Sequence, residues 1–220
     1  MKRVFGIFFG TVIAVIVLFG VAGTVAWWNA WVFIAYMMLI GACTQILVKK
    51  YPGLAEERRT ASAKAKQWDL KFVRLINLAL PVMLFVAALD IRFRGLSSVP
   101  GPASIAALMV MAPAALLTYR AIAVNIFFSS HVRIQAERGH VVVTTGPYRF
   151  VRHPGYAGSI LFNLLVPVAL GSWFALLPGV GTAVLLVSRT VKEDRVLIEE
   201  LPGYSTYTKQ VRHRLIPGIF

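Results

Sequence analysis

The amino-acid sequence predicts an all-α protein, a polytopic bundle of about six transmembrane helices of which the last two form a short hairpin. Three observations support this fold class: the apolar composition, the length of the apolar runs and the uneven placement of the basic residues. Of the 220 residues, 58% are hydrophobic and 15% are charged, whereas soluble domains average about 45–50% and 25%. A chain this apolar is expected to be solvated largely by lipid.

Four apolar runs are long enough to cross a bilayer, whose hydrocarbon core needs roughly 20 helical residues. The first run follows Lys2 and Arg3, and no charged residue occurs from there to Val48. The apolar core of a signal peptide is much shorter, about 7–15 residues, so we expect the first run to be retained as a membrane helix. The four runs comprise residues 4–26, 30–48, 72–89 and 103–124.

Two shorter apolar runs follow at residues 158–171 and 173–188, and each is marginal for crossing a bilayer alone. Gly171 and Ser172 join them, a pair that favours a tight turn. We therefore expect a helical hairpin, tilted or broken within the membrane. The only cysteine, Cys43, lies inside an apolar run, so no intrachain disulfide is expected.

The basic residues predict the orientation of the bundle. The chain has 23 Lys plus Arg and 9 Asp plus Glu, a net charge of +14. If both termini are cytoplasmic, 20 basic residues lie in cytoplasmic segments and only Arg92 and Arg94 lie on the opposite side, which agrees with the positive-inside rule. We expect a multi-pass membrane protein with both termini and the polar C-terminal region in the cytoplasm. The basic excess suits the anionic headgroups of the lipid bilayer, and no nucleic-acid partner is expected because aromatic-interleaved basic runs and zinc spacings are missing.

Most of the polar chemistry lies in the last ninety or so residues. Residues 140–158 read HVVVTTGPYRFVRHPGYAG, in which Gly and Pro predict a loop between apolar segments. Backbone groups of a loop at a membrane surface must be satisfied by protein, water or a ligand, so this segment is either a basic connector or a binding site. Further along, Arg189 and Glu193 share one helix face, either as an ordinary surface ion pair or as part of that site. The four histidines have neither helical ligand spacing nor a cysteine partner, so no metal site is expected.

These motifs together resemble the isoprenylcysteine carboxyl methyltransferase family and the related phospholipid N-methyltransferases. The resemblance covers about residues 125–220, and its parts are His140, GPYRFVRHPGYAG, Arg189, Glu193-Asp194 and a Tyr204/Tyr207 tail that ends in VRHRLIP. It implies a membrane methyltransferase that holds S-adenosylmethionine on its cytoplasmic face and takes a lipophilic acceptor from the membrane. Residues 1–130 would then be a transmembrane scaffold, and residues 131–220, hairpin included, the cofactor-binding and catalytic region.

The resemblance also implies roles for individual residues. The catalytic positions would be Arg189 on the substrate side, Glu193 and Asp194. A carboxylate acceptor could be oriented by a two-point contact with Arg189, whereas an amine acceptor must lose a proton and would make Asp194 or Glu193 a candidate base. The cofactor contacts would be Gln135, His140, Val141, Val142, Val143, Tyr148, His153, Pro154, Gly155, Tyr156 and Glu193.

Other functions are compatible with the same residues. One is N-methylation of a phospholipid or a small amine, and another is an NADPH-dependent reductase of the membrane sterol type, whose C-terminal end is similar in architecture. The Arg-x-x-x-Glu-Asp pairing and a histidine eight residues before Tyr148 fit methyltransferases better than reductases. A non-catalytic transport module should carry charges within its spans, and these spans are nearly free of them. The sequence leaves the acceptor and the oligomeric state open.

Overall fold

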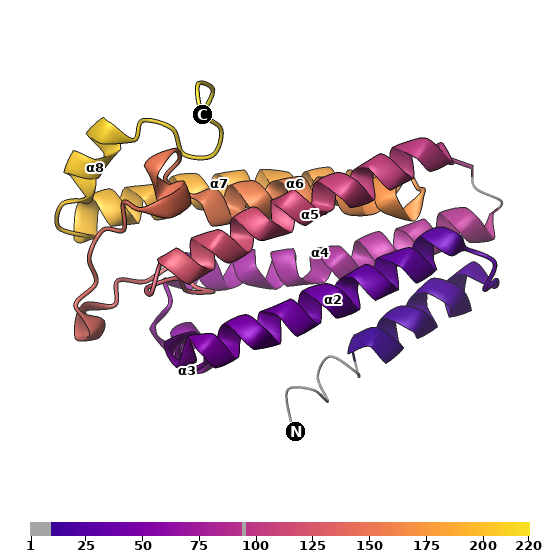
Figure 1. The fold of residues 1–220 in the computed structure, drawn as a ribbon, viewed down its shortest axis with the longest axis horizontal. Coiled ribbons are helices and arrows are strands. Elements are labelled where there is room, and N and C mark those ends of the chain that lie inside the picture. Colours follow the sequence, from indigo (N-terminus) through magenta and orange to yellow (C-terminus); the bar gives the residue numbers. More distant parts are fainter. Residues whose placement is uncertain (1–9, 94–95) are drawn as a thin grey trace.

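The computed structural model describes residues 10–93 and 96–220, and the described residues fold into a helical bundle without a β-strand (Figure 1). An apolar helix over Gly10–Gly20 comes first and contains the π-helical stretch η1 (Ile16–Gly20). The α-helices that follow are α2 (Trp28–Lys50), α3 (Pro52–Thr60), α4 (Gln67–Arg92), α5 (Gly101–Val124), α6 (Pro154–Leu170), α7 (Leu176–Glu200) and α8 (Tyr204–Gln210). Short 3-10 helices lie at η2 (Ala61–Lys64), η3 (Ala136–Arg138) and η4 (Gly146–Arg149).

Three helices, α2, α4 and α5, are long and apolar enough to cross a membrane. They contain the predicted runs 30–48, 72–89 and 103–124, and Figure 1 shows that all three run along the long axis of the molecule. Of the first predicted run, residues 4–9 lie outside the described residues, and the apolar helix from Gly10 onward agrees with it. The predicted class, an all-α integral membrane bundle, is confirmed.

Helices α6 and α7 form the predicted hairpin, but α7 differs from the prediction at both ends. It starts at Leu176 instead of Trp173, and it continues as one helix past Ser188 to Glu200. Hydropathy marks only the part of a helix that lipid solvates, whereas backbone hydrogen bonding continues through the polar residues that follow. Gly171 makes the turn in a left-handed conformation, φ +86°, which a glycine adopts without steric cost. The polar part of α7 therefore projects beyond the apolar bundle.

The loops at the end of the bundle that holds the α6–α7 turn are fastened to one another. Asp90, at the end of α4 and 4% exposed, accepts hydrogen bonds from the backbone and hydroxyl of Ser97 and from the hydroxyl of Ser172. Trp27 and Asn29 donate to the carbonyls of Leu170 and Ala169. The helices are thus fixed relative to one another at the end opposite α3 and α8, which we call the closed end; the end with α3 and α8 we call the polar end (Figure 1).

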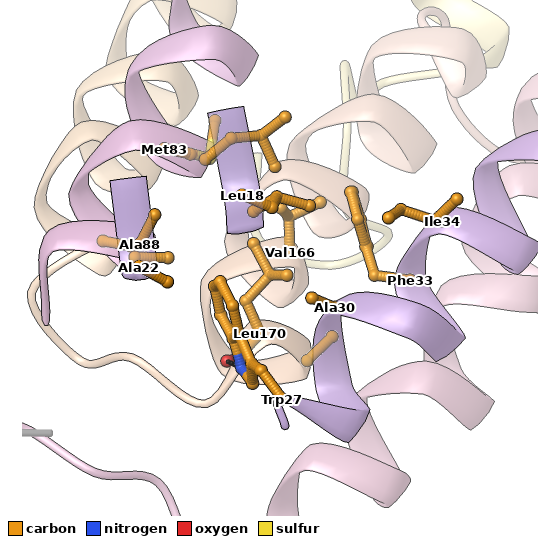
Figure 2. Packing of buried hydrophobic residues seen from close by; sticks show 14 of the residues in the cluster. Leu18, Ala22, Trp27, Ala30, Phe33, Ile34, Met83, Ala88, Val166 and Leu170 are labelled. Carbon is orange, nitrogen blue, oxygen red and sulfur yellow. Dashed lines mark hydrogen bonds between the residues drawn. The ribbon is translucent and has the colours of Figure 1, made fainter. Parts of the chain in front are cut away.

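The main hydrophobic core lies between the N-terminal helix, α2, α4 and α6, as Figure 2 shows. Leu18, Phe33, Met83 and Leu170 are almost completely buried there. Several alanines, such as Ala88, are fully buried in this core, which fits membrane helices, where small residues let backbones approach one another. The core therefore sets the helix positions on which the polar end is built.

Gly158 allows the closest approach of α5 to α6, and replacing it should be costly. A Cβ atom at Gly158 would lie 2.5 Å from the carbonyl oxygen of Ala114 and would overlap Thr118. We expect Gly158→Ala to lower the free energy of unfolding by about 1–3 kcal/mol, the usual cost of overpacking. The matched control is Gly181→Ala in α7, where a Cβ atom would meet no described atom within 4 Å and should gain about 0.5–1 kcal/mol. Thermal unfolding in detergent measures both, and equal effects would contradict the close packing.

Candidate active site

A cavity of about 390 Å³ lies at the polar end, within the range of about 300–1,000 Å³ that is typical of small-molecule sites. Its walls come from α4, α5, α6, α7, α8 and from residues 125–153, which we call the site loop. The cavity is therefore assembled from parts of the chain that are distant in sequence, and it lies where the apolar helices end and the polar segments begin.

Ten of the predicted site residues line this cavity, and three do not. Gln135, Pro154 and Asp194 are absent from its lining, and each has a fully buried side chain. Those that line the cavity are His140, Val141, Val142, Val143, Tyr148, His153, Gly155, Tyr156, Arg189 and Glu193. The structure thus brings together residues of the loop and of α7 that the sequence could only associate by motif order.

The segment Val141–Val143 presents open backbone groups to the cavity. Among the described residues, its N–H and C=O groups make no hydrogen bond to protein, so they are free for a ligand or water. Gly139, in the left-handed region at φ +63°, turns the chain out of η3 and into this segment. The side chain of Val142 packs on the buried Tyr204 and Tyr207, which holds the segment against the tail.

His140 begins this segment and stacks against Phe127, with 4.6 Å between the ring centroids. Its Nδ1 accepts the backbone N–H of Gln135 at 3.3 Å, so the neutral ring carries its proton on Nε2. Burial lowers the pKa of His140, and the cationic Arg133 and Arg138 lower it further. Gln135 itself bonds the carbonyl of Phe127 and the guanidinium of Arg138. Gln135 therefore stabilises the site loop from outside the cavity lining. The Nε2 proton of His140 can be donated into the cavity.

Glu193 and Tyr156 form one wall of the cavity. The hydroxyl of Tyr156 donates to the carboxylate of Glu193. The Tyr156 ring stacks on His153, with centroids 5.8 Å apart, and the guanidinium of Arg189 lies over the Tyr156 ring at 5.3 Å. A carboxylate next to aromatic faces is an environment that attracts a cationic ligand group.

Arg189 is 6% exposed and pairs with an acid that lies far away in the sequence. Its Nε and Nη2 donate to the two carboxylate oxygens of Asp69, at 2.6 and 3.1 Å, and Nη2 also donates to the carbonyl of Ser130 at 2.8 Å. Glu193, one turn further along α7, is bonded by Tyr156 instead. The two-point contact expected for Arg189 is therefore made to Asp69, and Nη1 makes no hydrogen bond within the described residues.

Asp194 is the centre of a buried network and is completely inaccessible. Its two oxygens accept from Nε and Nη2 of Arg152, both at 2.8 Å, and from Nε of Arg214 at 2.8 Å. The hydroxyl of Tyr204 donates at 2.9 Å, and Nε2 of His153 lies 3.1 Å away. Because Arg152 also donates to the carbonyls of residues 211 and 212, the network joins the site loop, α7 and the C-terminal tail. The tail thereby forms part of the cavity wall.

A second buried ion pair fastens the site loop to the scaffold, and sequence reasoning missed it. Glu57, in α3 and 3% exposed, accepts from Nε of Arg133 at 2.9 Å, from Nη2 of Arg133 and from the hydroxyl of Ser129. Burial raises the pKa of Glu57, but the hydrogen bonds from Arg133 and Ser129 outweigh it and leave the pKa below its usual range. Asp69, also missed, has the same role toward Arg189. The one available signal was the rarity of acids, because Glu57 and Asp69 are two of only nine.

The part of the cavity toward the bundle is lined by residues of the membrane helices. Ile76, Ile122 and Leu186 contribute apolar walls, and Thr118, Ser159 and Asn163 add a few polar groups. The hydroxyl of Ser159 and the amide of Asn163 donate to carbonyls within α6. One cavity thus joins a polar half at the site loop to a mostly apolar half between the helices.

Comparison with known proteins agrees with this site. Residues 104–199 match the model of the Isoprenylcysteine carboxyl methyltransferase (ICMT) family. The match runs from the start of α5 through the site loop and the hairpin to the end of α7, and it includes all ten predicted residues that line the cavity, Arg189 among them. No curated protein matches the chain. Over residues 104–199 the chain is therefore similar to the isoprenylcysteine carboxyl methyltransferase family, a family of methyltransferases.

Proposed function

We propose that the protein transfers a methyl group from S-adenosylmethionine to the carboxylate of a lipophilic acceptor. The observation that supports this most is the composition of the single cavity at the polar end among the described residues. It combines open backbone groups, a carboxylate beside aromatic rings, and a buried arginine with one free nitrogen. In the same cavity, apolar helix walls lead toward the membrane part of the bundle.

The polar half fits the chemistry of the cofactor. The open backbone of Val141–Val143 and the Nε2 proton of His140 offer hydrogen bonds to a purine or to an amino-acid group. Glu193 can accept hydroxyl or ammonium protons, and the ring of Tyr148 suits a sulfonium cation. Burial raises the pKa of Tyr148, so its hydroxyl stays neutral. The buried residues Gln135, Pro154 and Asp194 lie outside the cavity lining and would hold these groups in place.

Bound S-adenosylmethionine would supply an electrophilic methyl group. The residues of the chain would position the acceptor and exclude water. Nη1 of Arg189 can hold an acceptor carboxylate in place, and the apolar helix walls exclude water from the reacting atoms. The attacking oxygen is already ionised near neutral pH, so the new bond from oxygen to the methyl carbon would form as the methyl–sulfur bond breaks. The products would be a methyl ester and S-adenosylhomocysteine, and no proton has to be removed. No general base is required.

The geometry favours a carboxylate over an amine acceptor. An amine must lose a proton, and the two acids considered for that task are engaged. Asp194 is completely buried and accepts from Arg152, Arg214 and Tyr204. Glu193 already accepts from Tyr156. Both protons of Arg189 Nη1 also remain for an acceptor carboxylate, whereas an ammonium group cannot accept them. N-methylation of a phospholipid or small amine is therefore the second candidate, and a sterol-type reductase the third.

Binding and transfer measurements on the purified protein in detergent test this function. Calorimetry should show binding of S-adenosylmethionine and much weaker binding of NADPH. With methyl-labelled S-adenosylmethionine, label should enter a farnesylated cysteine with a free α-carboxylate, as a base-labile ester. The control is the same compound with its carboxylate already esterified. Tight binding of NADPH alone would favour the reductase, and label in phosphatidylethanolamine vesicles but not in the cysteine would favour the amine acceptor.

We further propose that the polar end faces the cytoplasm, as the distribution of basic residues predicts. In a Cys43→Ser background, a cysteine at Ala63 in η2 should react with an impermeant maleimide in inside-out vesicles and not in right-side-out vesicles. A cysteine at Leu96, which is 74% exposed near the closed end, should show the opposite pattern. Reaction of the Ala63 cysteine in right-side-out vesicles would reverse the orientation.

A further inference from the structure

Asp69 lies in the first turn of α4, within the part of the chain predicted to be only scaffold, yet it belongs to the site. It is 0% exposed, and it binds Arg189 through both oxygens although 120 positions separate the two residues. One of the same oxygens accepts the backbone N–H of Val132 at 2.9 Å. Asp69 therefore contacts both α7 and the site loop from a third element.

The hydrogen bonds of Arg189 determine which of its nitrogens a ligand can use. Nε has one proton, which goes to Asp69, and Nη2 has two, which go to Asp69 and to the carbonyl of Ser130. Both protons of Nη1 remain, and Arg189 lines the cavity. We infer that Asp69 is a positioning residue for methyl transfer: it orients Arg189 so that only Nη1 meets the acceptor carboxylate. This inference rests on the proposed function.

Asp69 also keeps Arg189 away from Glu193. The two residues are four positions apart on α7, a spacing at which an arginine and a glutamate attract each other. With Asp69 in place, Arg189 is held toward α4, and Glu193 stays with Tyr156 on the cofactor side. Without the charge of Asp69, Arg189 would gain an alternative partner in Glu193. Because three protons of the planar guanidinium are donated to Asp69 and Ser130, its orientation is fixed. A single contact with the acceptor could not fix this orientation.

The experiment measures methyl transfer to farnesylated cysteine for four variants: Asp69→Asn, Arg189→Ala, the double variant and the control Asp90→Asn. Asp90 is a buried acid on the same helix, but at the closed end. Asp69→Asn should lower kcat/KM for the acceptor at least tenfold, with folding intact. The amide keeps one acceptor oxygen but cannot bind both guanidinium nitrogens. Asp90→Asn is expected to lower thermal stability and to leave kcat/KM within about threefold of wild type.

The double variant separates positioning from a general structural role. If Asp69 acts through Arg189, adding Asp69→Asn to Arg189→Ala should change kcat/KM no further, because residues that act as a unit are not additive. The inference would be overturned if the losses in kcat/KM were additive. It would also be overturned if Asp69→Asn were fully active while Arg189→Ala had low activity. If Asp69→Asn does not fold, Asp69→Glu decides: it keeps the charge but displaces Arg189, so full activity would overturn the inference. Absence of transfer by the wild type would instead contradict the proposed function, and the inference with it.

Discussion

Asp194→Asn is expected to lower the free energy of unfolding by about 3–5 kcal/mol, the usual cost of removing one member of a buried ion pair. The side chain is completely buried, and the Arg152 that it neutralises is 6% exposed. An amide in its place would leave that guanidinium in the interior without a counter-charge. Because Arg152 and Arg214 hold the C-terminal tail through this acid, the tail and the cavity wall that it forms should loosen together.

The matched control is Glu199→Gln, the same type of change at an exposed position of α7. Exposed substitutions usually stay within about 0.5 kcal/mol. Thermal unfolding of both variants in one detergent gives the comparison, and calorimetry on folded protein gives the affinity for S-adenosylmethionine. A variant Asp194→Asn that unfolds like the wild type and loses only turnover would instead support a catalytic base, and with it an amine acceptor.

Arg189→Lys and Glu193→Gln should affect different ligands, although the two residues lie one helical turn apart. Lysine has one nitrogen, so it cannot bond both oxygens of Asp69, the Ser130 carbonyl and the acceptor at once. We expect Arg189→Lys to lower kcat/KM for the acceptor tenfold or more, about 1.4 kcal/mol in transition-state stabilisation. The affinity for S-adenosylmethionine should stay close to that of the wild type.

Glu193→Gln should instead weaken binding of S-adenosylmethionine, by about tenfold if one charge-assisted hydrogen bond of roughly 1.5 kcal/mol is lost. The amide oxygen can still accept from Tyr156, so folding should be preserved. Arg195→Lys, an exposed change on the same helix, serves as the control and should alter neither quantity. Equal losses of cofactor affinity in Arg189→Lys and Glu193→Gln, with normal unfolding temperatures, would contradict the division of labour.

The sequence alone was sufficient for the membrane fold, because the signal is local. A run of apolar residues has to be long enough for the bilayer whatever it packs against, so the runs within α2, α4 and α5 could be found without knowing their neighbours. The end of α7 could not be found in this way, because hydropathy does not report the helical hydrogen bonding that continues beyond Ser188. Much of the loop was also predictable, because Val141–Val143 and Tyr156 belong to one short stretch of motif.

The tertiary structure alone decided which charges meet. Nothing near Asp69 in the sequence marks it as the partner of a residue 120 positions away, and Glu57 lies 76 positions from its partner Arg133. The sequence also could not show that Gln135 and Asp194 are fully buried and lie outside the cavity lining. Periodicity tells which face of a helix is apolar, but the partner of a charge depends on how helices pack. A charge that packing removes from water must then find its counter-charge wherever the fold has placed one.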